Sequence, residues 1–202
     1  MQGLAALPAD VDAKAVWLAN VIGARSKELE ARLVAPTREA AVLVGLVERP
    51  AGLNLLLTER AAHLQHHPGQ VSFPGGRLID PEEGPVAAAL REASEEVGLA
   101  PEQAEVLGIL PPSLTGTGFT VTPVVAWLTE AFQAQPDPTE VNAVFEVPIK
   151  HLLVPGNCQR GTWERFGTRF RVHEFHFEEY RIWGATAEIL VQFFEVINAK
   201  TI

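Results

Sequence analysis

Apolar residues recur at helical spacing near the start of the chain. From Asp10, a residue suited to cap a helix, they stand at Val11, Ala15, Leu18, Val21 and Ile22. A second helical stretch covers 26–33 and stops before Pro36. Residues 1–35 are too few to bury a core alone, so we expect a helical N-terminal extension followed by one domain over 36–202.

Strand-like runs dominate the rest of the sequence. The runs at 40–47 and 53–58 are separated by turn residues at 49–52 and predict a β-hairpin. Other patterns predict strands at 106–110, 121–128, 144–147 and 169–177, and a closing helix at 185–197. Strands mixed with a few helices favour an α+β or α/β fold with a mixed sheet.

One helix is predicted with particular clarity between Pro85 and Gly98. Proline is favoured in the first helical turn, and glycine is favoured just past the end of a helix. The run Ala87–Ala89 gives this helix a thin face that can pack closely against a neighbour.

The same helix carries an unusual group of carboxylates. Glu92, Glu95 and Glu96 lie three or four residues apart, so one turn gathers them towards overlapping faces, where like charges repel. Arg91 can pair with Glu95 at i,i+4 and hold one of them. A hard, oxygen-seeking cation such as Mg²⁺ or Mn²⁺ would reverse the repulsion. The alternative is an ordinary solvated helix face.

Composition limits the possible functions. With 202 residues, 47% of them hydrophobic, the chain can form a sizeable core, and a net charge of −9 disfavours binding to nucleic acid or to anionic membrane. No apolar run approaches the length of a membrane span, and the N-terminus lacks the pattern of a secretory signal. A single cysteine, Cys158, excludes an intrachain disulfide. We expect a soluble cytoplasmic protein.

Read as a whole, the segment from Gly76 to Leu99 (GRLIDPEEGPVAAALREASEEVGL) resembles the Nudix box. The family pattern is Gly, five residues, Glu, seven residues, and then Arg-Glu-apolar-x-Glu-Glu-x-Gly-apolar. The second half matches without a gap from Arg91 to Leu99. The first half is one residue longer, so counting from either end gives Glu82 or Glu83 as its glutamate.

The resemblance implies a metal-dependent hydrolase with an α/β/α sandwich, cleaving a nucleoside diphosphate linked to another group. It implies Mg²⁺ or Mn²⁺ bound by Glu92, Glu96, Glu95 and the carbonyl group of Gly76. Arg91 completes the expected catalytic set. The proton acceptor stays open between Glu92, Glu96 and a carboxylate from a later loop, for which the candidates are Glu140 and Glu146.

Residues around the box resemble the coenzyme A pyrophosphatase branch of the family. Upstream lie Leu-Leu-Thr-Glu-Arg at 56–60 and Gly-Gln-Val-Ser-Phe-Pro-Gly-Gly at 69–76, and similar blocks follow at 110–112, 118–123, 144–148 and 182–187. This resemblance implies hydrolysis of coenzyme A or its thioesters to 3′,5′-ADP and (acyl-)4′-phosphopantetheine. The expected substrate-binding residues are Arg60, His63, His67, Gly75 and Gly76. Gln65 departs from the branch, where a basic residue is expected.

Two other functions remain open at this stage. The first is a Nudix hydrolase of ADP-ribose, NADH or a modified nucleotide, which the departure at Gln65 favours. The second is a non-catalytic, Nudix-like module that senses a nucleotide. A zinc site at His63, His66 and His67 is disfavoured because no cysteine or carboxylate completes the spacing. Relatives often pair, so a homodimer is also an expectation from resemblance.

Overall fold

The computed structural model describes residues 38–80, 82–115, 118–154, 156–165 and 168–197. The predicted helices within 1–35 lie outside these residues, and the domain boundary near residue 36 stays a prediction. In the described ranges, no helix is long and apolar enough to cross a membrane.

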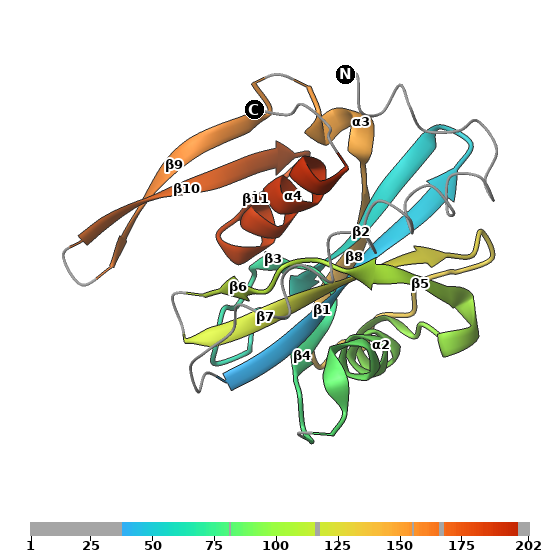
Figure 1. Cartoon of the computed structure of the whole chain (residues 1–202). Helices are drawn as coiled ribbons and strands as arrows, with labels where there is room; N and C mark the ends of the chain where they lie inside the picture. The colour runs from blue at the N-terminus through green and yellow to red at the C-terminus, as the bar shows by residue number, and fades with distance from the viewer. Residues whose placement is uncertain (1–37, 81, 116–117, 155, 166–167, 198–202) are drawn as a thin grey trace.

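An eight-stranded mixed sheet forms the centre of the molecule (Figure 1). Its main order is β3-β2-β1-β7-β5, with β4 paired to β1, β6 to β7 and β8 to β2. The strands are β1 Arg38–Arg49, β2 Gly52–Arg60, β3 Val71–Ser72, β4 Gly75–Arg77, β5 Ala104–Ile109, β6 Ser113–Leu114, β7 Phe119–Leu128 and β8 Val141–Pro148. Neighbours pair antiparallel except β1 and β7, which run parallel from Arg38 beside Phe119 to Val47 beside Leu128.

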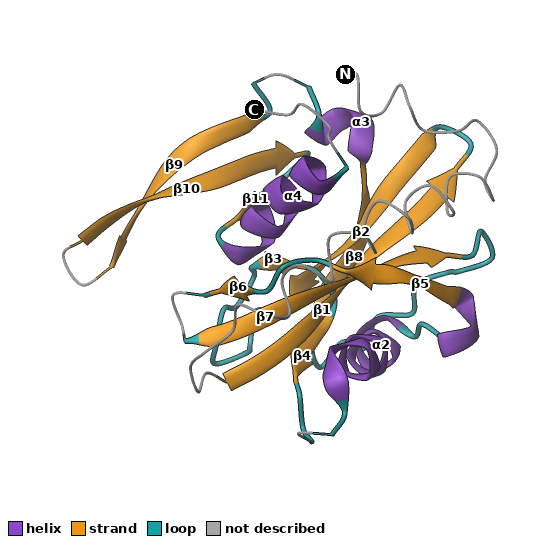
Figure 2. Cartoon of the chain, viewed as in Figure 1, coloured by secondary structure: helices purple, strands orange, loops and turns teal. Residues whose placement is uncertain are grey.

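Two different layers cover the two faces of this sheet (Figure 2). Helix α2, Gly84–Val97, lies on one face, whereas helix α4, Ala185–Val196, lies on the other beside a three-stranded sheet. That sheet has the order β11-β10-β9, from β9 Cys158–Arg165, β10 Thr168–Phe177 and β11 Tyr180–Trp183. Two short helices, η3 Pro101–Gln103 and α3 Ile149–Leu152, complete the described elements.

The alternation of side chains along β1 produces two separate cores. Leu43 and Val47 pack towards α2, and Val44 and Leu46 pack towards α4 and the smaller sheet. The predicted α+β fold, with a mixed sheet between helices, is confirmed. The predicted hairpin, the later strands and the closing helix are also present, but the three-stranded sheet was predicted only for its middle strand.

Candidate active site

Helix α2 packs very close to the sheet because small residues form its inner face. Ala88, Ala89 and Ala93 are fully buried in the core on that side, as expected for a thin helix face. Ala87 was wrongly expected to share it: the residue is exposed, because it lies round the helix from the other two. The helix ends at Gly98, which adopts a left-handed φ of 69° and donates its N–H to the Ser94 carbonyl group. The close packing places the carboxylates beside β4.

Glu96 is a buried carboxylate, only 3% exposed. Its Oε2 accepts a hydrogen bond from the Gly75 N–H at 3.1 Å, and its Oε1 lies 3.8 Å from Nη1 of Arg60. Burial raises the pKa of Glu96 to about 7, although Gly75 and Arg60 oppose the rise and the charges of Glu92 and Glu140 add to it. The site therefore holds a carboxylate at a considerable electrostatic cost.

Glu92 lies one helical turn before Glu96 and faces Gly76. A Cβ atom at residue 76 would collide with the Glu92 carboxylate, so glycine is required for this approach. Burial also raises the pKa of Glu92, although Arg91 opposes the rise, and the charges of Glu95 and Glu140 add to it. The carboxylates of Glu92 and Glu96 thus line the Gly75–Gly76 backbone.

Arg91 connects the helix to the preceding loop. Its Nε donates to Glu83 at 2.7 Å, its Nη1 to Glu92 at 2.8 Å and to Glu95 at 3.2 Å, and its Nη2 to the Arg77 carbonyl group at 3.0 Å. The expected Arg91–Glu95 pair is present, but Glu95 is one of four residues that the Arg91 side chain contacts.

The loop before α2 also distinguishes Glu82 from Glu83, the two candidates for the first glutamate of the motif. Glu83 accepts hydrogen bonds from Arg91 and from the Ile79 N–H, and the Arg91 bond lowers its pKa. Glu82 is exposed, and its backbone N–H bonds to Asp80. Glu83 is therefore the residue that the arginine of the motif holds.

Two other candidate carboxylates have different surroundings. Glu140, just before β8, lies close enough for its charge to raise the pKa values of both Glu92 and Glu96. Glu146 instead accepts hydrogen bonds from Arg49 at 2.6 Å and from Asn54 at 2.9 Å, so it links strands. Glu95 has a side chain that is 58% exposed. Of Glu140 and Glu146, only Glu140 thus acts electrostatically on Glu92 and Glu96.

The loop between β2 and β3 carries the two expected histidines. His63 is exposed, with its Nε2 3.1 Å from the Thr139 carbonyl oxygen, and His67 is exposed with a φ of 56°. Within the described ranges, no hydrogen bond or ion pair joins either histidine to the glutamates of α2. Arg60, Gly75 and Gly76 contact the carboxylates of α2, whereas His63 contacts the backbone one residue before Glu140.

The oxygen atoms of Glu92, Glu96 and the Gly76 carbonyl group are of the chemical type that binds a hard divalent cation. Carboxylate and carbonyl oxygens are the ligands that Mg²⁺ and Mn²⁺ prefer, and a bound cation would favour the charged forms that burial and, to a smaller extent, mutual repulsion disfavour. As the side chains stand in the described residues, no three carboxylate, histidine or cysteine groups already enclose a metal position. Arg91 is paired with Glu92, and Arg60 lies beside Glu96, so a cation bound here would share these two carboxylates with the two arginines.

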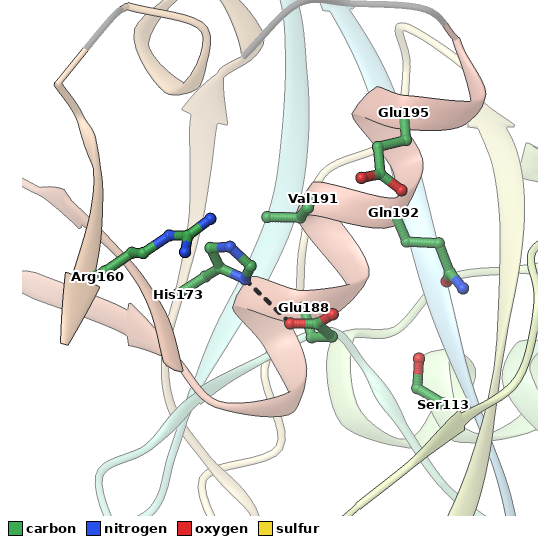
Figure 3. A pocket seen from close by; sticks show the side chains of 7 residues that line it. All are labelled: Ser113, Arg160, His173, Glu188, Val191, Gln192 and Glu195. Carbon is green, nitrogen blue, oxygen red and sulfur yellow. Dashed lines mark hydrogen bonds and ion pairs between the residues drawn. The ribbon is translucent and has the colours of Figure 1, made fainter. Parts of the chain in front are cut away.

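A cavity that sequence reasoning did not predict lies on the other side of the sheet (Figure 3). It has a volume of about 320 Å³ and is lined by Ser113, Arg160, His173, Glu188, Val191, Gln192 and Glu195. His173 Nδ1 lies 3.0 Å from Glu188 Oε2, and the buried Oε1 of Gln192 has no hydrogen-bond partner. None of the lining residues belongs to α2 or β4, so the cavity is separate from the carboxylates.

Comparison with known proteins gives concordant results. The model of the NUDIX domain matches residues 36–166. A Salmonella paratyphi B protein named "Uncharacterized Nudix hydrolase NudL" is 44% identical over 163 residues, which cover 81% of this chain and 84% of the relative.

Two solved structures align with this chain. A MutT/nudix family protein from Enterococcus faecalis aligns with 95% of this chain and 75% of its own, at a TM-score of 0.53 and 16% identity. A Nudix hydrolase from M. smegmatis, RenU, aligns with 59% of this chain and 75% of its own, at a TM-score of 0.49 and 27% identity.

Proposed function

Because this chain belongs to the NUDIX domain family, we propose that it hydrolyses the diphosphate of coenzyme A or of its thioesters. The products would be 3′,5′-ADP and 4′-phosphopantetheine or its acylated form. The coarser assignment is secure: the chain is a Nudix hydrolase, an enzyme acting on a nucleoside diphosphate derivative. Enzymes of this family generally use divalent cations such as Mg²⁺ or Mn²⁺.

One observation supports coenzyme A in particular. The two upstream blocks that resemble the coenzyme A pyrophosphatase branch, 56–60 and 69–76, end at residues that contact the carboxylates of α2. The first ends at Arg60, beside Glu96, and the second ends at Gly75 and Gly76. These contacts support the proposal, because the ends of both blocks lie beside the carboxylates of α2.

The charges of the site suit hydrolysis of a diphosphate. Held by Glu92, Glu96 and the Gly76 carbonyl group, Mg²⁺ or Mn²⁺ would neutralise phosphate charge and lower the pKa of the attacking water. Arg60 lies beside Glu96, and its planar guanidinium can donate two hydrogen bonds to one phosphate group. Glu92, Glu96 and Glu140 are the carboxylates available to accept the proton of the water. Arg91, held by Glu83, keeps Glu92 oriented.

The test is a substrate panel with product identification. The protein is incubated with Mg²⁺ or Mn²⁺ and, in parallel, with coenzyme A, ADP-ribose, NADH and dinucleoside polyphosphates, and the products are identified by mass spectrometry. We expect 3′,5′-ADP and 4′-phosphopantetheine from coenzyme A at the highest kcat/KM. Release of AMP from the other compounds, with coenzyme A left intact, would overturn the assignment.

The second candidate function is hydrolysis of ADP-ribose or NADH. Gln65 favours it, because this exposed residue stands where the coenzyme A branch is expected to carry a base. A Gln65→Lys or Gln65→Arg variant distinguishes the two functions. A gain in kcat/KM for coenzyme A alone would support the first, and a loss of ADP-ribose hydrolysis alone would support the second.

A further inference from the structure

We propose that His63 is a positioning residue for the hydrolysis. Through the carbonyl group of Thr139, its imidazole holds in place the next residue, Glu140, which acts on the carboxylates of α2. The inference rests on the hydrolase activity of the proposed function and not on coenzyme A, so it applies to whichever diphosphate the enzyme cleaves best. It gives His63 a role different from the contact with substrate that the resemblance in sequence implies.

The contact behind this role joins the loop between β2 and β3 to the segment before β8. His63 Nε2 lies 3.1 Å from the Thr139 carbonyl oxygen. A carbonyl oxygen only accepts hydrogen bonds, so Nε2 carries the hydrogen and donates it. The next carbonyl group, that of Glu140, accepts the Ala61 N–H at 2.8 Å. Two adjacent carbonyl groups of the segment are therefore held from the same loop.

The segment before β8 is also bonded to α2. The Asp137 N–H donates to the Glu96 carbonyl group at 3.0 Å. The Asp137 carboxylate accepts hydrogen bonds from the N–H and the hydroxyl group of Thr139, each at 2.8 Å. The Asp137 carbonyl group accepts the Glu140 N–H at 3.1 Å, which closes a turn. From this turn, the charge of Glu140 contributes to the raised pKa values of Glu92 and Glu96.

The loop that carries His63 is closed at its base. The Arg60 N–H donates to the Gln70 carbonyl group at 3.0 Å, and the Gly69 N–H donates to the Arg60 carbonyl group at 3.1 Å. The Arg60 guanidinium in turn lies 3.8 Å from Glu96 Oε1. Because the base of the loop is fixed beside the carboxylates, a hydrogen bond from its side chain restricts the movement of the partner segment.

The exposure of this hydrogen bond favours a role in turnover over a role in stability. His63, Thr139 and Glu140 are all exposed. Substitution of an exposed residue usually changes the free energy of unfolding little. In contrast, a small displacement of a carboxylate that acts at a reacting centre can lower the rate strongly, because the reaction depends on geometry. Loss of the bond should therefore change turnover more than stability.

The experiment compares two amides at position 63 that differ in reach. The amide nitrogen of glutamine is the same number of bonds from Cα as His63 Nε2, whereas that of asparagine is one bond closer. With Mg²⁺ and the best substrate of the panel, His63→Asn should lower kcat by about tenfold with KM changed less than about twofold. His63→Gln should keep most of the wild-type kcat. His66→Asn is the matched control, because His66 is an exposed histidine of the same loop, and it should keep the wild-type values.

Hydrogen exchange tests the position of the segment without turnover. In the wild-type protein, the Ala61 amide is bonded to Glu140 and the Glu140 amide to Asp137. His63→Asn should increase the exchange rates of both amides severalfold, whereas His63→Gln and His66→Asn should leave them unchanged. Circular dichroism should be the same for all variants.

The kinetic outcomes distinguish positioning from contact with substrate. A rise in KM with kcat unchanged in His63→Asn would show that His63 contacts the substrate and would overturn the inference. Equal kcat values for His63→Asn and His66→Asn would also overturn it, as would an equal loss in His63→Asn and His63→Gln. If the wild-type protein cleaves no compound of the panel, the proposed function is wrong, and the exchange rates then decide whether His63 holds the segment.

Discussion

At the scale of single residues, Glu96 is the most constrained group of the site. It is buried, it accepts the Gly75 N–H, and it lies beside Arg60. Glutamine at this position can still accept the Gly75 hydrogen bond, but it provides neither the charge nor the two oxygens that a divalent cation requires. The residue is therefore suited to a test that separates chemistry from folding.

We expect Glu96→Gln to lower kcat by about 10²-fold or more, the usual effect of removing one group that stabilises charge in the transition state. Circular dichroism should remain unchanged. Glu105→Gln is the control, because Glu105 is an exposed carboxylate on β5 away from the site. Activity of Glu96→Gln equal to that of this control would show that Glu96 does not bind the metal.

At the scale of elements, two adjacent glycines of β4 lie close to different neighbours. Gly75 lies against the backbone of β1, and Gly76 lies against the Glu92 side chain of α2. A Cβ at Gly75 would collide with backbone atoms of Ala41 and Val42 on β1, whereas a Cβ at Gly76 would collide with the Glu92 carboxylate. Backbone in a sheet cannot move aside cheaply, but a side chain can turn away.

Alanine at these two positions should therefore have different effects. Gly75→Ala should reduce the free energy of unfolding by about 1–3 kcal/mol, as overpacking does. Gly76→Ala should cost less stability but lower metal-dependent activity by about tenfold or more, because Glu92 is displaced. Urea denaturation and steady-state kinetics measure the two effects. Equal loss of stability in both variants would contradict this division of roles.

Glu146 of β8, which is hydrogen-bonded to Arg49 of β1 and Asn54 of β2, makes a pH-dependent contribution to the free energy of unfolding. Burial acts to raise the pKa of Glu146, but hydrogen bonds from Arg49 and Asn54 outweigh it, so the pKa lies below its ordinary value of 4.5. A lowered carboxyl pKa stabilises the fold above pH 4.5, and this contribution is lost as the pH falls further. We expect Glu146→Gln to cost about 1 kcal/mol at pH 7 and clearly less at pH 4. Urea denaturation at both pH values tests this, and a constant cost would contradict it.

At the scale of the whole molecule, the net charge and the buried carboxylates predict stabilisation by metal. A ligand that binds only the folded state at ten times its Kd adds about 1.4 kcal/mol, which is a few degrees in Tm for a chain of this size. Millimolar Mg²⁺ should produce this rise, and NaCl of equal ionic strength should not. Glu96→Gln should lose most of it. A rise of the same size with NaCl would point to general screening instead.

Local signals explain most of what the sequence predicted correctly. Pro85, Gly98 and the periodic apolar positions define α2 within one segment, and the hairpin of β1 and β2 depends on a turn between neighbours. In contrast, β4 is a three-residue strand with two glycines, and it exists because β1 pairs with it. No local pattern marks such a strand.

The same distinction applies to the site. The carboxylates of α2 follow from helical spacing, and the Nudix-like motif identified them together. The approach of Glu140 depends on how the loop before β8 lies against α2, and the choice of Glu83 over Glu82 depends on a bond to Arg91. The substrate-binding role of the histidines at 63 and 67 follows only from the resemblance and stays a prediction; His63 contacts the Thr139 carbonyl oxygen, one residue before Glu140.

The parallel pairing of β1 with β7 imposes an order on folding. Helix α2 rests on Val124, Ala126 and Leu128 of β7, which follow it in the chain, as well as on β1. A nascent chain that ends at Ser113 would leave the alanine face of α2 without its partners on β7. The carboxylates of α2 therefore acquire their final surroundings only after β7 and the loop up to Glu140 have left the ribosome, and earlier fragments should be sensitive to proteolysis within α2.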